Sequence, residues 1–441
     1  MRRRLLIILL ALGFLVAACG DDGGGETGEA ATTSTVAGTD AASDDADAGD
    51  APTTGDDETA ESDEAATDEV DTEALSAAIF EEIDAWMTEG EIDVPGLTLT
   101  VLLPDDELRM ARGVADLRTD ALVTPDSYFR IGSVTKTITS VAILQLVDEG
   151  LLDLDEPVAT YLGPGWLAGY ELDGVDYGDQ VTVRQILDHT DGFKEFAWDP
   201  GFYLQTSLRL DQAYKPQELI DWAVDQGPLF VPGEDYSYNT VGHVAAGLLI
   251  EEITGNEAHE ELRRRVYEPL GLDNIFLPPG ERPPNPVVHG YAVGELKTVL
   301  NAIPATEQYR DVGEIGEYYD MSVIPQEAIT SAGWTGGGIE AQSADVAAIF
   351  RGIFDGTLLS DEMIAELTTT NPYSDYGLGL TVGTDLDQTA YSHGGGVPGF
   401  RSHAVYWPDL DIALAMSANA VPIEPDVGVL AERILAVLTE G

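Results

Sequence analysis

The sequence is poor in cysteine and in positive charge. Its 441 residues include a single cysteine, Cys19, so neither an intrachain disulfide nor a cysteine-based metal site can form. Lys and Arg number 21 against 80 Asp and Glu, which gives a formal net charge of −59. A field of that sign repels phosphate backbones and excludes nucleic-acid binding. Because 44% of the residues are hydrophobic, most of the chain is still expected to fold around a core.

Several common catalytic signatures are also absent. The chain has no Gly-x-Ser-x-Gly elbow, no His-Glu-x-x-His and no glycine loop ending in Lys-Ser/Thr. These absences remove the main support for an α/β-hydrolase, for a zinc protease of that type and for a P-loop enzyme. The spacing of the six His residues offers no zinc pair, so we predict neither a metal nor a cofactor.

The first 72 residues have the composition of a targeting signal followed by a tether. Three arginines at positions 2–4 precede an apolar run over residues 5–18, which is typical of a secretory signal and too short for an ordinary spanning helix. Residues 21–73 contain 19 acidic residues and no Lys or Arg. We therefore predict a signal over 1–18, a disordered acidic linker over 19–72 and a folded domain over 73–441.

The folded domain shows strand patterns near both of its ends. Apolar residues at helical spacing predict a helix at Leu75–Trp86 and another over 427–438. Two hairpins are expected, over 96–103 with 108–114 and over 401–407 with 411–417. The long segment between them is rich in helical patterns. The sequence therefore predicts an α/β fold in which a sheet built from both ends carries an inserted, mostly helical lobe.

Ser133 and Lys136 form the first candidate catalytic pair. The chain has four lysines, and Lys136 alone has a serine three places before it. A helix beginning near Ser133 would place both on one face, with free backbone donors at the serine. Burial would lower the lysine pKa from about 10.4, so that Lys136 could act as general base for a Ser133 nucleophile. For the pair alone, a capping serine with an exposed lysine remains the alternative.

A series of motifs in chain order gives the pair a context. It begins with residues 129–161 and continues at 181–187, 189–190, 232–234, 268–272, 376–379, 393–395 and 398–400. The series resembles the serine β-lactamase and penicillin-binding superfamily, in particular its branch of class C β-lactamases and D-Ala-D-Ala carboxypeptidases. The resemblance covers about residues 74–441. It implies an acyl-enzyme serine hydrolase and an antiparallel sheet beside a helical lobe.

The resemblance also assigns candidate site residues. Tyr238 takes the place of the family's proton-shuttling tyrosine, with Tyr236 as an alternative register. Thr240 stands where the family has asparagine, and Asn239 precedes it; both are candidates for substrate binding. His393 would be a titratable partner close to Tyr238, with an unperturbed pKa near 6.5.

Backbone and glycine positions complete the predicted site. The backbone N–H groups of Ser133 and Gly396 are the implied oxyanion hole, and Gly395 is a candidate for substrate binding. Gly394 lacks the hydroxyl that helps to bind the substrate carboxylate in the family. Arg401 is either a substitute carboxylate partner or an arginine at the strand edge. These departures favour a carboxypeptidase or an esterase over a dedicated β-lactamase.

Residues 15–19, Leu-Val-Ala-Ala-Cys, resemble the lipobox of bacterial lipoproteins. The resemblance implies that the signal is cut before Cys19, which is then acylated and anchors the chain at the extracytoplasmic face of the cell membrane. We thus expect a lipid-anchored serine hydrolase acting on a small-molecule or peptide substrate: a D-amino-acid peptide, an ester or a β-lactam. The alternative is a non-catalytic lipoprotein that binds or senses cell-wall peptide or β-lactam.

Overall fold

The computed structural model describes residues 72–302 and 304–440. Cys19, the predicted signal over 1–18 and nearly all of the predicted linker lie outside the described residues. None of the described helices is both long and apolar enough to cross a membrane.

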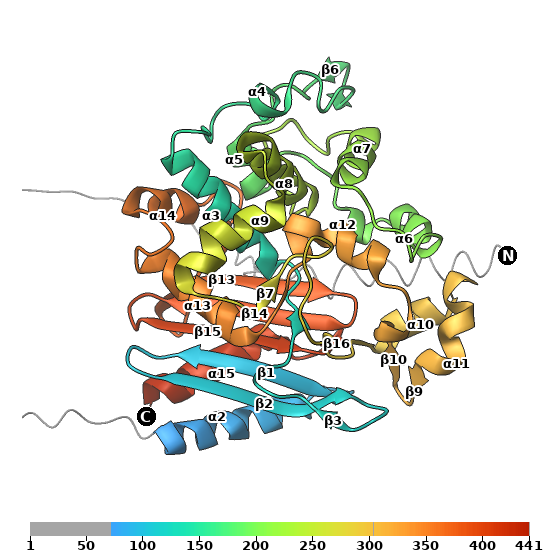
Figure 1. Ribbon diagram of the computed structural model, residues 1–441, viewed down its shortest axis with the longest axis vertical. Helices are drawn as coiled ribbons and strands as arrows, with labels where there is room; N and C mark the ends of the chain where they lie inside the picture. Colours follow the sequence, from blue (N-terminus) through green and yellow to red (C-terminus); the bar gives the residue numbers. More distant parts are fainter. Residues whose placement is uncertain (1–71, 303, 441) are drawn as a thin grey trace, which may run out of the picture. The chain divides into compact units, whose positions relative to one another are not determined.

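A seven-stranded sheet combines strands from the two ends of the domain (Figure 1). Its order is β12-β13-β14-β15-β1-β2-β3, and neighbouring strands are antiparallel. The strands are β1 (Gly96–Leu102), β2 (Glu107–Asp116), β3 (Ala121–Leu122), β12 (Thr381–Asp385), β13 (Gln388–Val397), β14 (Phe400–Trp407) and β15 (Ile412–Ala418). The central pair, β1 with β15, joins the N-terminal and C-terminal strands, with Leu99 opposite Met416. The predicted fold class is confirmed.

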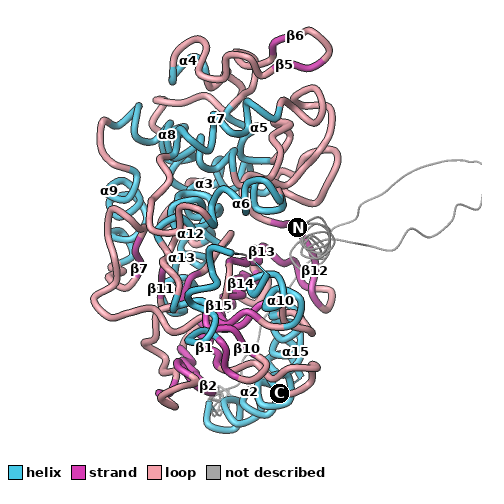
Figure 2. The backbone as a smooth tube through the Cα atoms, turned by 90° about the vertical axis from the view of Figure 1, so that its right-hand side faces the viewer, coloured by secondary structure: helices cyan, strands magenta, loops and turns pink. Residues whose placement is uncertain are grey.

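Helices cover both faces of this sheet, and the alternation of side chains along β1 shows why. Leu97, Leu99 and Val101 are buried in a core shared with α2 (Thr72–Met87) and α15 (Val427–Glu440). Burying an aliphatic side chain of this kind contributes roughly 1.5–3 kcal/mol. Thr98 and Thr100 point the other way and contact the Ser343 hydroxyl of α13 (Ser343–Phe354). Figure 2 accordingly shows strands between α13 and α15.

The helical lobe is inserted between β3 and β12 and lies beyond the β13 side of the sheet (Figure 1). Its central helix, α3 (Val134–Asp148), is buried on nearly all sides. Around it lie α4 (Ala159–Leu162), α5 (Val183–Asp188), α6 (Pro200–Ser207), α7 (Pro216–Gln226), α8 (Val241–Thr254), α9 (Ala258–Leu262), α12 (Glu327–Gly337) and α14 (Asp361–Thr368). A smaller group comprises α10 (Gly294–Ala302), α11 (Arg310–Gly313), β8 (Tyr291–Ala292), β9 (Glu314–Ile315), β10 (Tyr318–Asp320) and β16 (Ala420–Val421).

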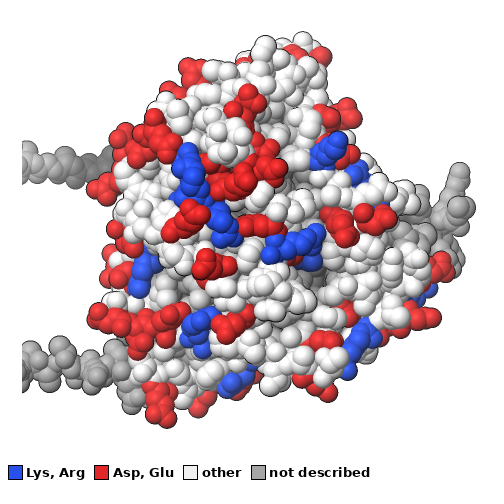
Figure 3. All heavy atoms as spheres, viewed as in Figure 1, with Lys and Arg blue, Asp and Glu red and all other residues white. Residues whose placement is uncertain are grey.

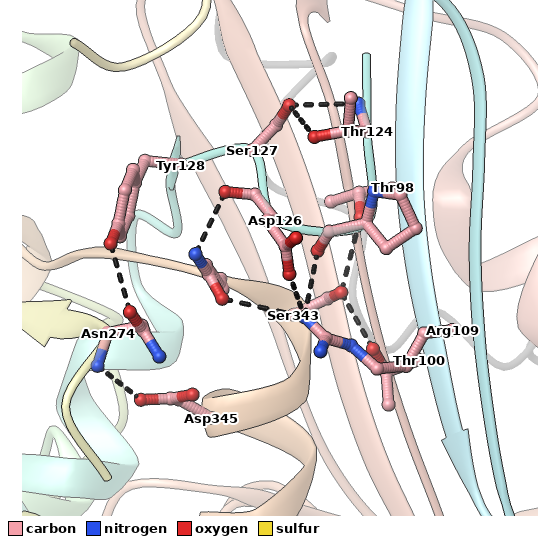
Figure 4. A network of polar contacts seen from close by, with 12 residues as sticks. Thr98, Thr100, Arg109, Thr124, Asp126, Ser127, Tyr128, Asn274, Ser343 and Asp345 are labelled. Carbon is pink, nitrogen blue, oxygen red and sulfur yellow. Dashed lines mark hydrogen bonds and ion pairs between the residues drawn. The ribbon is translucent and has the colours of Figure 1, made fainter. Parts of the chain in front are cut away.

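A short sheet and a polar network hold the segment that leads into α3. The strands β4 (Phe129–Arg130), β11 (Glu340–Ala341) and β7 (Ile275–Phe276) pair side by side. Just before β4, the Asp126 carboxylate accepts a hydrogen bond from Arg109 Nη2 at 2.7 Å, and the Tyr128 hydroxyl donates to Asn274 at 3.0 Å (Figure 4). These bonds attach the segment to the large sheet on one side and to the lobe on the other, shortly before α3 begins.

The acidic character predicted from composition extends over the folded domain. Figure 3 shows acidic side chains spread over the face of the molecule that is seen in Figure 1, with basic side chains among them. Several of the basic groups are in ion pairs, such as Arg184 with Asp155 and Glu366 at 2.7 Å each. Exposed pairs of this kind contribute about 0–1 kcal/mol each, so their main effect is to offset repulsion among neighbouring acids.

Candidate active site

Ser133 and Lys136 lie together at the start of α3. Ser133 is the N-cap residue, and the Lys136 Nζ atom lies 3.1 Å from its Oγ atom. Nζ also lies 2.7 Å from the Gly336 carbonyl oxygen and 3.5 Å from Thr240 Oγ1. Lys136 is completely buried, which rules out the alternative of an exposed lysine. Burial lowers its pKa to about 7, with Glu195 opposing the shift, so much of the amine is neutral near pH 7 and available as a base.

Gly132 allows the turn that carries Ser133 to approach β13. Gly132 has a φ of +51°, and a Cβ atom there would lie 2.8 Å from the Gly396 nitrogen. A Cβ atom on Gly395 would lie 2.0 Å from the Ile131 carbonyl oxygen. Both glycines are therefore required by close backbone approach. The backbone of Gly396 thus lies beside the serine turn, where the predicted oxyanion hole needs it; that role stays a prediction, as does substrate binding at Gly395.

Tyr238, the first of the two candidate tyrosines, packs its ring beside the lysine. Lys136 Nζ lies 4.8 Å from the centre of the half-buried Tyr238 ring. Tyr238 also packs closer to the buried His189 ring than Tyr236 does, with ring centroids 4.5 Å and 6.0 Å apart, respectively. A cation next to the ring stabilises the phenolate form, as a proton shuttle at Tyr238 requires.

Of the two residues predicted to replace the family's asparagine, one faces the lysine and the other does not. Thr240 caps the start of α8 and places its hydroxyl next to Lys136. Asn239 is fully buried, donates to Asp191 at 2.9 Å and accepts from the Gly242 N–H at 2.8 Å. The prediction that Asn239 binds substrate is wrong, because both ends of its amide are used inside the lobe.

His393 is close to the site but is not the titratable partner that we predicted. It is 4% exposed, and burial together with Lys136 lowers its pKa to about 3, so it is neutral in the physiological range. Its Nδ1 atom lies 2.5 Å from the Gly394 carbonyl oxygen, which can only accept, so Nδ1 carries the hydrogen. Nε2 therefore accepts a hydrogen bond from the Tyr376 hydroxyl at 2.8 Å. His393 orients Tyr376 and carries no charge.

Arg401 lies on the wrong side of the sheet for a carboxylate partner. Its neighbour in β14, Ser402, points toward the serine turn and donates to the Ile131 carbonyl at 2.7 Å. Side chains alternate along a strand, so Arg401 points to the opposite face, where its Nε atom lies 2.5 Å from Asp426. The predicted contact with a substrate carboxylate is therefore wrong.

The place of Arg401 yields a first testable prediction. Replacing it with alanine removes one partner of an ion pair on the α15 side, so the free energy of unfolding should fall by about 1–3 kcal/mol. The KM ratio between an ester substrate and its carboxylate-bearing analogue should stay as in the native chain. Denaturant unfolding and steady-state kinetics measure the two effects; a KM increase confined to the carboxylate substrate would contradict this placement.

Three groups at the site were not singled out from the sequence. Tyr376 lies in a motif used for the resemblance, but no role was assigned to it. The Gly336 carbonyl comes from the end of α12, and the buried Glu195 from the loop before a short 3-10 helix. Among the described residues, no cluster of His, Cys, Asp and Glu could hold a metal ion.

Comparisons with known proteins agree with this arrangement. A model of the Beta-lactamase family matches residues 77–439. Penicillin-binding protein 4 of Amycolatopsis lactamdurans is 34% identical over 202 residues, which are 46% of this chain and 49% of that protein. This chain thus spans about half the length of that relative.

Solved structures show the same fold. A D-stereospecific amidohydrolase from Streptomyces sp. is 27% identical with a TM-score of 0.66, covering 81% of this chain and 97% of that one. The D-amino acid amidase from Ochrobactrum anthropi SV3, in complex with L-phenylalanine amide, has a TM-score of 0.69 at 22% identity and covers 83% and 99%. With a family model that spans nearly the whole described domain, and with these folds alongside it, the chain belongs to the Beta-lactamase family.

Proposed function

We propose that this chain is a serine hydrolase that forms an acyl-enzyme on Ser133. The observation that carries the proposal is the completely buried Lys136 amine 3.1 Å from Ser133 Oγ. Lys136 takes the hydroxyl proton while Oγ attacks the substrate carbonyl, and the N–H groups of Ser133 and Gly396 stabilise the oxyanion. The proton then passes by way of Tyr238 to the leaving nitrogen or oxygen. Water hydrolyses the acyl-serine in the second half of the reaction.

For the substrate, we propose the amide or ester of a D-amino acid or short D-peptide. The Streptomyces relative, named as a D-stereospecific amidohydrolase, aligns with nearly its full length. The two positions considered for carboxylate recognition do not provide it, because Gly394 has no side chain and Arg401 faces away. This supports substrates without a free carboxylate beside the scissile bond over carboxypeptidase substrates and β-lactams.

Intact mass spectrometry of the full chain with a fluorophosphonate tests the nucleophile. We expect one adduct per chain on Ser133, and none in the Ser133→Ala variant, whose melting temperature should be nearly unchanged. Hydrolysis of D- and L-phenylalanine amide and of the matching methyl esters then tests the acyl group. A native chain without any adduct would favour the non-catalytic binding protein.

The lipid anchor remains part of the proposal. We propose that residues 1–18 are removed, that Cys19 is acylated, and that the acidic segment over 19–72 tethers the domain outside the cytoplasmic membrane. The support is the sequence around the single cysteine. Expression in a bacterium with labelled fatty acid should give label in the membrane fraction, and Cys19→Ala should remove both the label and the membrane retention. Equal labelling of the two chains would refute acylation at Cys19.

A further inference from the structure

Glu195 is a buried carboxylate on the lobe side of the site. It is 6% exposed and precedes the short 3-10 helix Phe196–Trp198. One carboxylate oxygen accepts the Ala197 N–H at 2.6 Å, and the other accepts the Thr240 N–H. Two backbone donors on one carboxylate favour its ionised form. Glu195 therefore differs from the many exposed acids of this chain, because its carboxylate is buried and held by the backbone.

Thr240 connects Glu195 to Lys136. The threonine offers its N–H to Glu195, and its Oγ1 atom lies 3.5 Å from Lys136 Nζ. Because Thr240 is also the N-cap residue of α8, its position sets where that helix starts relative to α3. A single residue thus joins the buried acid, the buried base and the helix that follows Tyr238.

Other titratable groups also face Lys136, but they carry little charge. His189 at the end of α5, His243 on α8 and His393 on β13 are each buried, and burial lowers the pKa of each well below 6.5. Tyr238 faces Nζ with its ring. Beside Glu195, burial raises the pKa of Asp191 to about 8, so that carboxyl is mostly protonated at neutral pH. Glu195, whose two carboxylate oxygens accept backbone N–H groups, is the acid placed to balance a protonated lysine.

We propose that Glu195 is a positioning residue that holds Thr240 against Lys136 and supplies the counter-charge for the proton that the buried amine carries during turnover. The inference rests on the proposed function, in which Lys136 takes the Ser133 proton and later releases it. During that interval the fully buried Lys136 side chain carries a positive charge, and an isolated buried charge is very costly. An anion linked through one residue lowers that cost without bonding to the amine directly.

The proposal makes the proton affinity of Lys136 depend on Glu195. Burial lowers the pKa of Lys136, and the Glu195 charge raises it; conversely, burial raises the pKa of Glu195, and Lys136 lowers it. Because Lys136 must be neutral to accept a proton, the acylation rate should rise with pH through the titration of this pair. Without the anion, Lys136 should lose its proton at a lower pH and be a weaker base.

The rate of fluorophosphonate labelling from pH 5 to pH 9 tests the link with Glu195→Gln in the full chain. In the plot of labelling rate against pH, we expect the rising part on the acid side (the acid limb) to move to lower pH by roughly one pH unit. The maximal rate at higher pH (the plateau) should also be lower. Because the chain has four lysines, the Lys136 titration can also be followed directly by NMR of 13C-lysine-labelled protein. Asp191→Asn is the matched control: it removes a neighbouring buried carboxyl that does not bind Thr240, and the limb should not move.

Glu195→Asp covers the case in which Glu195→Gln fails to fold. Aspartate keeps the charge but, being shorter, holds it farther from Thr240, so the acid limb should shift less in the same direction. A lower plateau with an unmoved acid limb and an unmoved lysine titration would reduce Glu195 to a structural residue and overturn the inference. Absence of labelling in the native chain would refute the proposed function instead, and the NMR titration would still decide whether Glu195 controls Lys136.

Discussion

Lys136→Met should reduce the rate of Ser133 acylation by about 10³–10⁴-fold, because general-base catalysis of this kind contributes up to that amount. Methionine can take the place of the buried lysine side chain without offering a base. The rate constant for labelling by a fluorophosphonate, measured at the pH optimum of the native chain, gives the effect directly. Lys215→Met, at an exposed lysine at the start of α7, is the matched control and should label at the native rate.

The same substitution should change how stability depends on pH. Lys136 has a pKa of about 7 in the folded chain, compared with about 10.4 in the unfolded chain. Between these values the unfolded chain binds the additional proton, so this residue makes the native chain more stable as pH rises from about 7 to 10. Relative to Lys136→Met, the free energy of unfolding of the native chain should therefore increase over that range. Parallel curves for the two proteins would show that Lys136 has an ordinary pKa.

The nucleophile and its base could be predicted from sequence because a single helix carries both. A spacing of three along α3 fixes their separation whatever the rest of the chain does, and the structure gives 3.1 Å between Oγ and Nζ. The sheet was predictable for a similar reason, since each hairpin is a local pattern. The pairing of β1 with β15 joins residues more than 300 positions apart and followed from the expectation that both ends share one layer.

The predictions that were wrong depend on orientation and burial. Whether Asn239 or Thr240 faces the lysine is decided by how the loop turns into α8. Side chains alternate between the two faces of a strand, so the direction of Arg401 follows once Ser402 is known to face the turn that carries Ser133. The charge of His393 depends on desolvation, which composition does not show. Glu195 is one acid among 80 and reaches Lys136 through tertiary contact alone.

Gly395→Ala should separate β13 from the turn that carries the nucleophile. The new methyl group would lie 2.0 Å from the Ile131 carbonyl oxygen and 2.3 Å from the Ser402 hydroxyl, so the backbone must move or the hydrogen bond between them must break. We expect the free energy of unfolding to fall by about 3 kcal/mol or more. Acylation should slow by roughly 10²-fold, because Gly396 moves away from Ser133 and a shift of 1 Å can cost that much.

Gly383→Ala provides the matched control for this prediction. Gly383 lies in the adjacent strand β12, and no heavy atom lies within 4 Å of the position that its Cβ would take. The substitution changes the same backbone chemistry in the same sheet, so its unfolding curve and labelling rate should stay close to those of the native chain. If both variants lost activity equally, the effect would be a general weakening of the sheet. Loss confined to Gly395→Ala would show that close approach of β13 to residues 131–133 is what holds the backbone donors beside the nucleophile.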